Sequence, residues 1–114
     1  MVAYPLHGTQ METLAIVAVL EAKRGKEQEV EAFLTSALPL VRAERGTIGW
    51  YALKLGPSRF GIFDTFADQS GRDAHLAGEI ANALFARADE LFATAPAIEQ
   101  AEILAVKPRG VSTR

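Results

Sequence analysis

Residues 47–66 read TIGWYALKLGPSRFGIFDTF, and this stretch predicts a β-hairpin. Two runs rich in β-branched and aromatic residues, 47–55 and 59–66, flank the short turn sequence GPS. The second run contains three phenylalanines and one isoleucine, yet it also contains a carboxylate, Asp64. The location of this carboxylate in an otherwise apolar strand is the main question that the sequence raises about function.

A strand and a helix are predicted ahead of the hairpin. Residues 13–22 (TLAIVAVLEA) are apolar at odd and even positions, which is typical of a strand that is buried on both faces. Residues 25–46 carry apolar side chains at spacings of three and four, so they predict a helix. Pro39 cannot donate to the carbonyl four residues earlier, and it therefore predicts a kink or a break into two pieces.

A second helical region and a last strand are predicted after the hairpin. Ser70 and Asp73 resemble a capping box that opens the helical region, and Asp68 is a competing cap. Gly78 predicts a bend that divides this region. Residues 98–107 (IEQAEILAVK) predict the last strand.

The predicted order is β-α-β-β-α-β, the α+β arrangement of ferredoxin-like folds, in which both helical regions cover one face of a four-stranded antiparallel sheet. The predicted strands are apolar on the other face as well. A second copy of the chain, packed sheet against sheet about a two-fold axis, would cover that face. The sequence therefore predicts a homodimer.

Length and composition indicate one globular domain. The chain has 114 residues, of which 49% are hydrophobic and 23% are charged, so it can build an apolar core. We expect the domain to span residues 13–107, between a flexible N-terminal arm (1–12) and a C-terminal tail (108–114).

Several classes of function lack support in the sequence. The net charge of −2 and the absence of a basic cluster argue against a nucleic-acid partner. The absence of cysteine excludes disulfides and thiolate metal sites. The longest apolar run is too short to cross a bilayer and no signal peptide is evident, so we expect a cytoplasmic protein without a membrane partner.

Three stretches resemble the antibiotic biosynthesis monooxygenase superfamily, whose members are dimeric α/β-barrel proteins. They are AKRGKEQEVEAFL after the first strand, ERGTIGWYAL after the first helix, and RFGIFDTFADQSGRDAHL across the third strand and into the next helix. The resemblance covers about residues 13–107 and implies the ferredoxin-like fold and the dimer. The superfamily includes cofactor-free oxygenases and haem-degrading enzymes, and the resemblance implies that Asp64 and Phe66 face the cavity.

The hairpin predicts which residues accompany Asp64. If Leu55 pairs with Arg59, Trp50 lies opposite Asp64. One face then carries Ile48, Trp50, Ala52, Phe60, Ile62, Asp64 and Phe66. A carboxylate beneath packed helices would be costly without a partner. We therefore expect this face to lie away from the helices, where it would line a cavity and, at Ile62, the dimer interface.

His75 and Asp64 are the candidate catalytic residues. His75 titrates near neutral pH and is the better candidate for a general base, with Asp64 orienting either the imidazole or a substrate hydroxyl. Structural alternatives remain open: Asp64 could cap backbone amides or pair with Arg72 or Arg59, and His75 could bind a nearby carbonyl. The candidate substrate-binding residues are Trp50, Phe60, Ile62 and Phe66, and Trp50 could instead belong to the core or to the interface.

A cofactor-free monooxygenase acting on a small phenol or quinol fits these residues. Such a substrate becomes electron-rich enough to react with dioxygen once it loses a proton, so the protein needs a base, a dry cavity and aromatic walls but no cofactor. A non-catalytic protein that binds a small aromatic molecule is the main alternative. Haem binding or degradation has less support. Haem-degrading relatives have a tryptophan at the end of the third strand and a histidine further along, whereas this chain has Phe66 there and no histidine after His75.

Overall fold

The computed structural model describes residues 11–107. The predicted arm and tail therefore fall mainly outside the described residues. The elements follow in the order β1 (Leu14–Glu21), α1 (Glu27–Ser36), α2 (Leu38–Arg42), β2 (Thr47–Lys54), β3 (Arg59–Phe66), α3 (Gln69–Leu76), α4 (Glu79–Ala86), α5 (Ala88–Leu91) and β4 (Ala97–Glu102). The four strands form one antiparallel sheet in the order β2-β3-β1-β4. The predicted ferredoxin-like α+β fold is confirmed.

The hairpin of β2 and β3 has the predicted register. The amide of Leu55 donates to the carbonyl of Arg59 at 2.8 Å, and Trp50 lies directly opposite Asp64. The pairing becomes irregular between Thr47 and Gly49, at the start of β2. Asp64 and Trp50 thus share one face of the sheet.

The two predicted helical regions are divided where the sequence indicated. The first is broken between α1 and α2. Pro39 lies in the first turn of α2, where a backbone N–H would have no intrahelical acceptor, so its missing N–H costs no hydrogen bond. The second is divided at Gly78, the N-cap of α4. Of the two candidate caps, Asp68 is the one that opens α3, because its side chain accepts from the amide of Gly71 at 2.9 Å.

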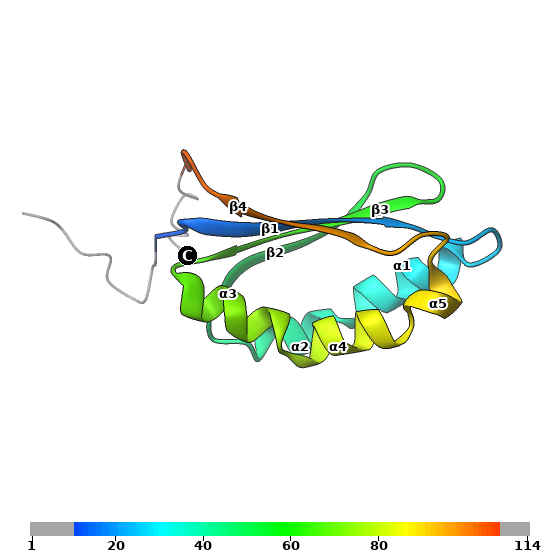
Figure 1. Cartoon of the computed structure of the whole chain (residues 1–114), viewed down its shortest axis with the longest axis horizontal. Helices are drawn as coiled ribbons and strands as arrows, with labels where there is room; N and C mark the ends of the chain where they lie inside the picture. Colours follow the sequence, from blue (N-terminus) through cyan, green and yellow to red (C-terminus); the bar gives the residue numbers. More distant parts are fainter. Residues whose placement is uncertain (1–10, 108–114) are drawn as a thin grey trace, which may run out of the picture.

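All five helices lie on one face of the sheet (Figure 1). The core between the two layers contains residues from β1 and β3 together with residues from α1, α4 and α5. Its most completely buried members are Leu20, Val30, Phe60 and Leu91.

The expectation about the two faces of the sheet was wrong. Phe60, Ile62 and Asp64 point toward the helices, and the opposite face is the open one. A carboxylate beneath the helices is costly only without a partner, and α3 supplies His75 as that partner. Ile62 therefore belongs to the core and cannot contribute to an interface on the open face.

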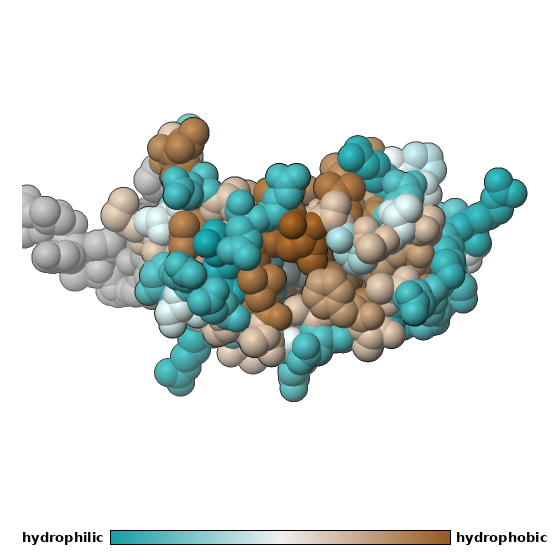
Figure 2. Space-filling view, viewed as in Figure 1, coloured by the Kyte–Doolittle hydropathy of each residue, from teal (hydrophilic) through white to brown (hydrophobic). Residues whose placement is uncertain are grey.

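The open face exposes large apolar side chains. Val17, Tyr51 and Leu53 are 39%, 44% and 42% exposed. Apolar side chains also reach the surface at the side of the molecule seen in Figure 2, where they gather between the sheet edge and the helices with hydrophilic residues around them. No helix within residues 11–107 has the length and apolar character needed to cross a membrane.

Candidate functional site

Asp64 is almost completely buried between β3 and the helices. Its side chain is 1% exposed, and its Oδ2 lies 2.9 Å from Nε2 of His75. An isolated carboxylate in such a place would be very unfavourable, so an oppositely charged partner is the condition for its burial. Of the partners considered for Asp64 from the sequence, which were Arg72, Arg59 and the imidazole of His75, the structure shows His75.

His75 lies in the last turn of α3, the end at which the helix dipole favours a positive charge. Asp68 fixes the other end of this helix. The imidazole ring is buried and packs against Phe66, with 5.5 Å between the ring centroids. Its Nδ1 lies 2.6 Å from Oε1 of Glu44, so both ring nitrogens contact carboxylates.

Glu44 belongs to the segment between α2 and β2. Its Oε1 also accepts from the hydroxyl of Thr47 at 2.8 Å. Two glycines let this segment approach α3: a Cβ on Gly71 would lie 2.7 Å from the carbonyl oxygen of Gly46. A Cβ on Gly78 would lie 3.0 Å from Oε2 of Glu44. The segment that carries Glu44 thus lies directly against α3, the helix that carries His75.

Sequence reasoning missed Glu44. One signal could have found it: an acidic residue directly after a helix has the wrong sign for the negative end of the helix dipole. Its neighbours Arg42 and Arg45 have the favourable sign. A carboxylate at such a place needs another partner, which here is His75.

The protonation of His75 follows from its two contacts. Burial alone lowers the pKa of His75, but hydrogen bonds to Asp64 and Glu44 and the charges of these carboxylates outweigh it and raise the pKa to about 8. Geometry agrees, because a neutral imidazole has only one N–H and could donate to only one of two carboxylates. At neutral pH the cluster of Asp64, His75 and Glu44 therefore holds an imidazolium between two carboxylates.

Three buried side-chain polar atoms have no hydrogen-bond partner among residues 11–107: Oδ1 of Asp64, Nε1 of Trp50 and Nε of Arg72 on α3. Asp64 and Trp50 lie directly opposite each other on the helix-facing side of β3 and β2. An ionised carboxylate oxygen can only accept and an indole nitrogen can only donate. Such orphaned buried groups are rare and are explained by a bound water, an ion or a ligand.

The structure brings together some of the predicted site residues and separates others. His75 contacts Asp64 and packs against Phe66, and Trp50 lies directly opposite Asp64 on the neighbouring strand. Trp50 is half-buried against the core. Phe60 and Ile62 lie nearer the hairpin turn, in the core against α1, α4 and α5.

Two surface hollows lie away from the cluster. One of about 600 Å³ follows α1 and includes Thr35 and Lys54. The other, of about 320 Å³, lies on the open face of the sheet and includes Tyr51, Phe63 and Val106. Neither is lined by Asp64 or His75. No group of three histidine or acidic side chains in residues 11–107 is arranged to hold a metal ion.

Comparisons with known proteins identify relatives by structure. No family model matches the chain, and no curated protein sequence matches it. A Nitrosomonas europaea protein of unknown function is 54% identical, with a TM-score of 0.84 over 90% of this chain and 100% of that one.

More distant similarities concern the fold. A candidate antibiotic biosynthesis monooxygenase from Nitrosomonas europaea is 13% identical, with a TM-score of 0.72 over 81% of this chain and 99% of that one. Another from Caulobacter crescentus is 18% identical, with a TM-score of 0.71 over 82% and 92%. The chain therefore has the fold of the antibiotic biosynthesis monooxygenase-like proteins, and it belongs to the same family as the Nitrosomonas europaea protein of unknown function.

Proposed function

We propose that the protein is a cofactor-free monooxygenase of a small phenol or quinol, and that Asp64 accepts the proton of the substrate hydroxyl. One observation carries this proposal: Oδ1 of Asp64 is a buried carboxylate oxygen without a donor among the described residues. A phenolic hydroxyl supplies the missing donor. The candidate monooxygenases that share the fold support the same class of reaction.

The assignment of the base differs from the initial hypothesis. Both nitrogens of His75 contact carboxylates, and its pKa is raised to about 8, so the imidazole is protonated and engaged at neutral pH. Asp64 has the free oxygen. In this arrangement the imidazolium compensates the negative charge that Asp64 and the substrate share as the proton moves.

The reaction needs only the substrate and dioxygen. Proton transfer to Asp64 leaves a phenolate, which passes one electron to dioxygen and forms a phenoxyl radical and superoxide. These combine at a ring carbon that carries hydrogen, and the proton returns from Asp64 to the peroxide. Loss of water then leaves a new carbonyl, so one oxygen atom enters the product and the other leaves as water.

Trp50 and Phe66 complete the proposed site. Nε1 of Trp50, which lies opposite Asp64, is a donor available to the phenolate oxygen, and a donor aimed at a developing charge stabilises the transition state. Phe66 supplies an apolar wall next to His75. Trp50 is only half-buried, whereas Asp64 and Phe66 are buried, so the Trp50 side chain is the one that can move to admit a ligand.

Oxygen uptake with a panel of naphthols and hydroquinones tests the proposal. On an accepted substrate, Asp64→Asn should lower turnover by about 10²–10⁴-fold, the usual effect of losing a general base. The methyl ether of the same substrate should not react, because it has no proton to transfer. Full turnover by Asp64→Asn would refute the role of Asp64.

The alternatives are distinguished in the same experiment. Trp50 is the only tryptophan, so its fluorescence reports binding of an aromatic ligand. Binding of naphthols without oxygen uptake would instead indicate a non-catalytic binding protein. A Soret band upon haem titration would indicate a haem protein.

A further inference from the structure

We propose that Glu44 is a positioning residue of this site, which fixes the orientation and the charge of His75 and so leaves Oδ1 of Asp64 as the oxygen that receives the substrate proton. The part that concerns the substrate rests on the proposed function. The part that concerns His75 stands on the contacts of the described residues alone.

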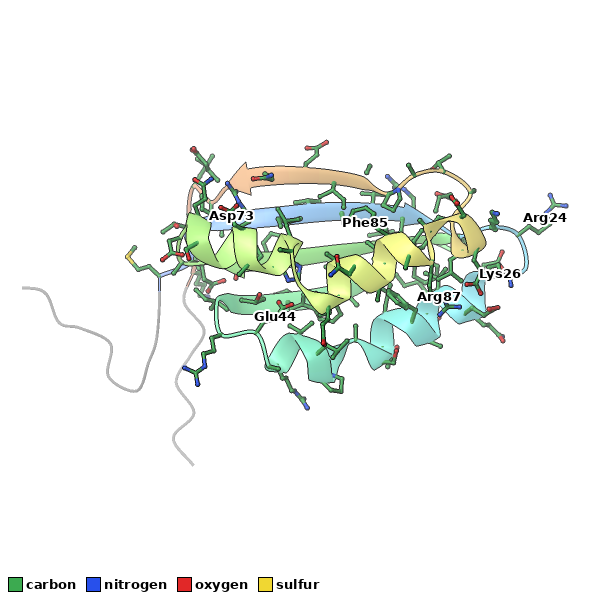
Figure 3. All side chains as sticks on the ribbon, turned by 60° about the horizontal axis from the view of Figure 1, so that its bottom comes forward. Arg24, Lys26, Glu44, Asp73, Phe85 and Arg87 are labelled. Carbon is green, nitrogen blue, oxygen red and sulfur yellow. The ribbon has the colours of Figure 1, made fainter. Side chains whose placement is uncertain are left out.

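The contacts of the imidazole determine its orientation. Nδ1 lies 2.6 Å from Glu44 and Nε2 lies 2.9 Å from Asp64, on opposite sides of the ring. Figure 3 shows Glu44 between the row of helices α1–α2 and the row α3–α5. A rotation of the ring would break both contacts at once. Glu44 thus directs Nε2 at Oδ2 of Asp64, and Oδ1 remains available.

Glu44 is itself held in place. The hydroxyl of Thr47 donates to the same oxygen that contacts His75. The close approach of Gly46 to Gly71 brings this segment against α3, and Gly78 leaves room for the second oxygen of Glu44.

The charged groups around His75 come from three elements. Asp64 faces it from β3, and Glu44 faces it from the segment between α2 and β2. On α3 itself, Arg72 lies one turn earlier and donates to the carbonyls of Ala15 and Ala101 instead. The two carboxylates are therefore the groups that stabilise the imidazolium, and Glu44 is the one that does not touch the substrate.

Removal of the Glu44 charge has a defined consequence. In Glu44→Gln the amide can donate to Nδ1, so a neutral imidazole with its proton on Nε2 satisfies both contacts. The imidazolium would then be lost at lower pH. Without it, the charge shared by Asp64 and the substrate would have no cation beside it, and turnover would fall on the alkaline side.

The experiment combines NMR with the pH dependence of turnover. In Glu44→Gln we expect the titration of His75 to move down by about one pH unit. The alkaline limb of oxygen uptake should move with it, so turnover should fall about tenfold near pH 9 and stay unchanged near pH 6. His75→Gln identifies the resonances, since His7 is the other histidine in the chain.

Matched variants make the test specific. Glu31→Gln removes an exposed carboxylate that pairs with Lys54, and it should move neither curve. Thr47→Val leaves Glu44 in place but removes its hydroxyl donor, and it should give a smaller shift in the same direction. If Glu44→Gln does not fold, the titration of His75 in Thr47→Val decides whether Glu44 sets the charge of the imidazole.

Two results would overturn the proposal. One is a His75 titration that does not change in Glu44→Gln or Thr47→Val, and the other is an alkaline limb that does not follow the titration. Absence of oxygen uptake with every substrate would refute the oxygenase. The NMR titration would still decide whether Glu44 sets the charge of His75.

Discussion

The two faces of the sheet differ in what covers them and in which side chains they carry. On the helix-covered face, Asp64 is buried and is paired with a histidine from the layer above. On the open face, apolar residues such as Val17, Tyr51 and Leu53 remain substantially exposed. Side chains alternate between the two faces along the strands, so alternation alone does not show which face the helices cover. The position of His75, the partner of Asp64, does show it.

The largest effect should come from a charge placed on the covered face. Ile62→Asp puts an unpaired carboxylate into the core, and we expect a loss of more than about 4 kcal/mol in the free energy of unfolding, enough to unfold the protein. Circular dichroism checks this directly. Ile62→Val at the same position should cost about 1 kcal/mol, and a folded Ile62→Asp would contradict the assignment of the faces.

Removal of the buried carboxylate should have the next largest effect. Asp64→Ala leaves Nε2 of His75 without its partner, and breaking a buried ion pair costs about 3–5 kcal/mol. Because His75 keeps its contact with Glu44, we expect a loss near the lower end of this range. Urea unfolding near pH 6 measures it. The exposed Asp73, on the same helix, provides the control, since Asp73→Ala should change stability by less than about 0.5 kcal/mol.

The charge of His75 should make stability depend on pH. Its pKa is raised from 6.5 to about 8 in the folded state, so the folded protein holds this proton more tightly than the unfolded chain. The stabilisation is fully present below about pH 6.5 and is lost as the pH rises through about 8, with a magnitude of about 2 kcal/mol. Unfolding curves measured across this interval check it. The dependence should vanish in His75→Gln, and an equal dependence there would assign it to another group.

The smallest effect on the fold should come from a charge on the open face. We propose that a second copy of the chain covers this face, and Val17 lies near the middle of it on β1. Val17→Lys faces Glu99 on β4, so the folded chain should lose less than about 1 kcal/mol. The dimer should nevertheless dissociate. Sedimentation equilibrium measures the mass, and a wild-type monomer at micromolar concentration would exclude the dimer.

Much of the fold could be predicted because its signals are local. The GPS turn fixed the register that places Trp50 opposite Asp64, since pairing follows from the turn once the strands are recognised. Pro39 and Gly78 indicated the helix breaks for equally local reasons. The last strand was predicted too long, because β4 ends at Glu102 although apolar residues continue beyond it.

The site could be predicted only in part, because its contacts join distant segments. His75 and Asp64 were recognised as candidate catalytic residues, and orientation of the imidazole by Asp64 was one of the two roles considered, but the location of this pair beneath the helices was not expected. Glu44 lies 31 residues from His75 in the sequence and has no periodic pattern around it. The face that the helices cover depended on this same contact, so one missing partner led to the wrong orientation of the sheet.

The close approach of Gly46 and Gly71 also bears on the order in which the chain folds. The hairpin of β2 and β3 joins neighbouring segments, whereas the contact between Glu44 and His75 joins residues 31 positions apart, so we expect α3 to dock after the hairpin has formed. We expect this docking to follow the rate-limiting step. Substitutions at Glu44 or Gly71 should then accelerate unfolding and leave the refolding rate nearly unchanged, so the cluster would govern the lifetime of the native protein more than the speed of its formation.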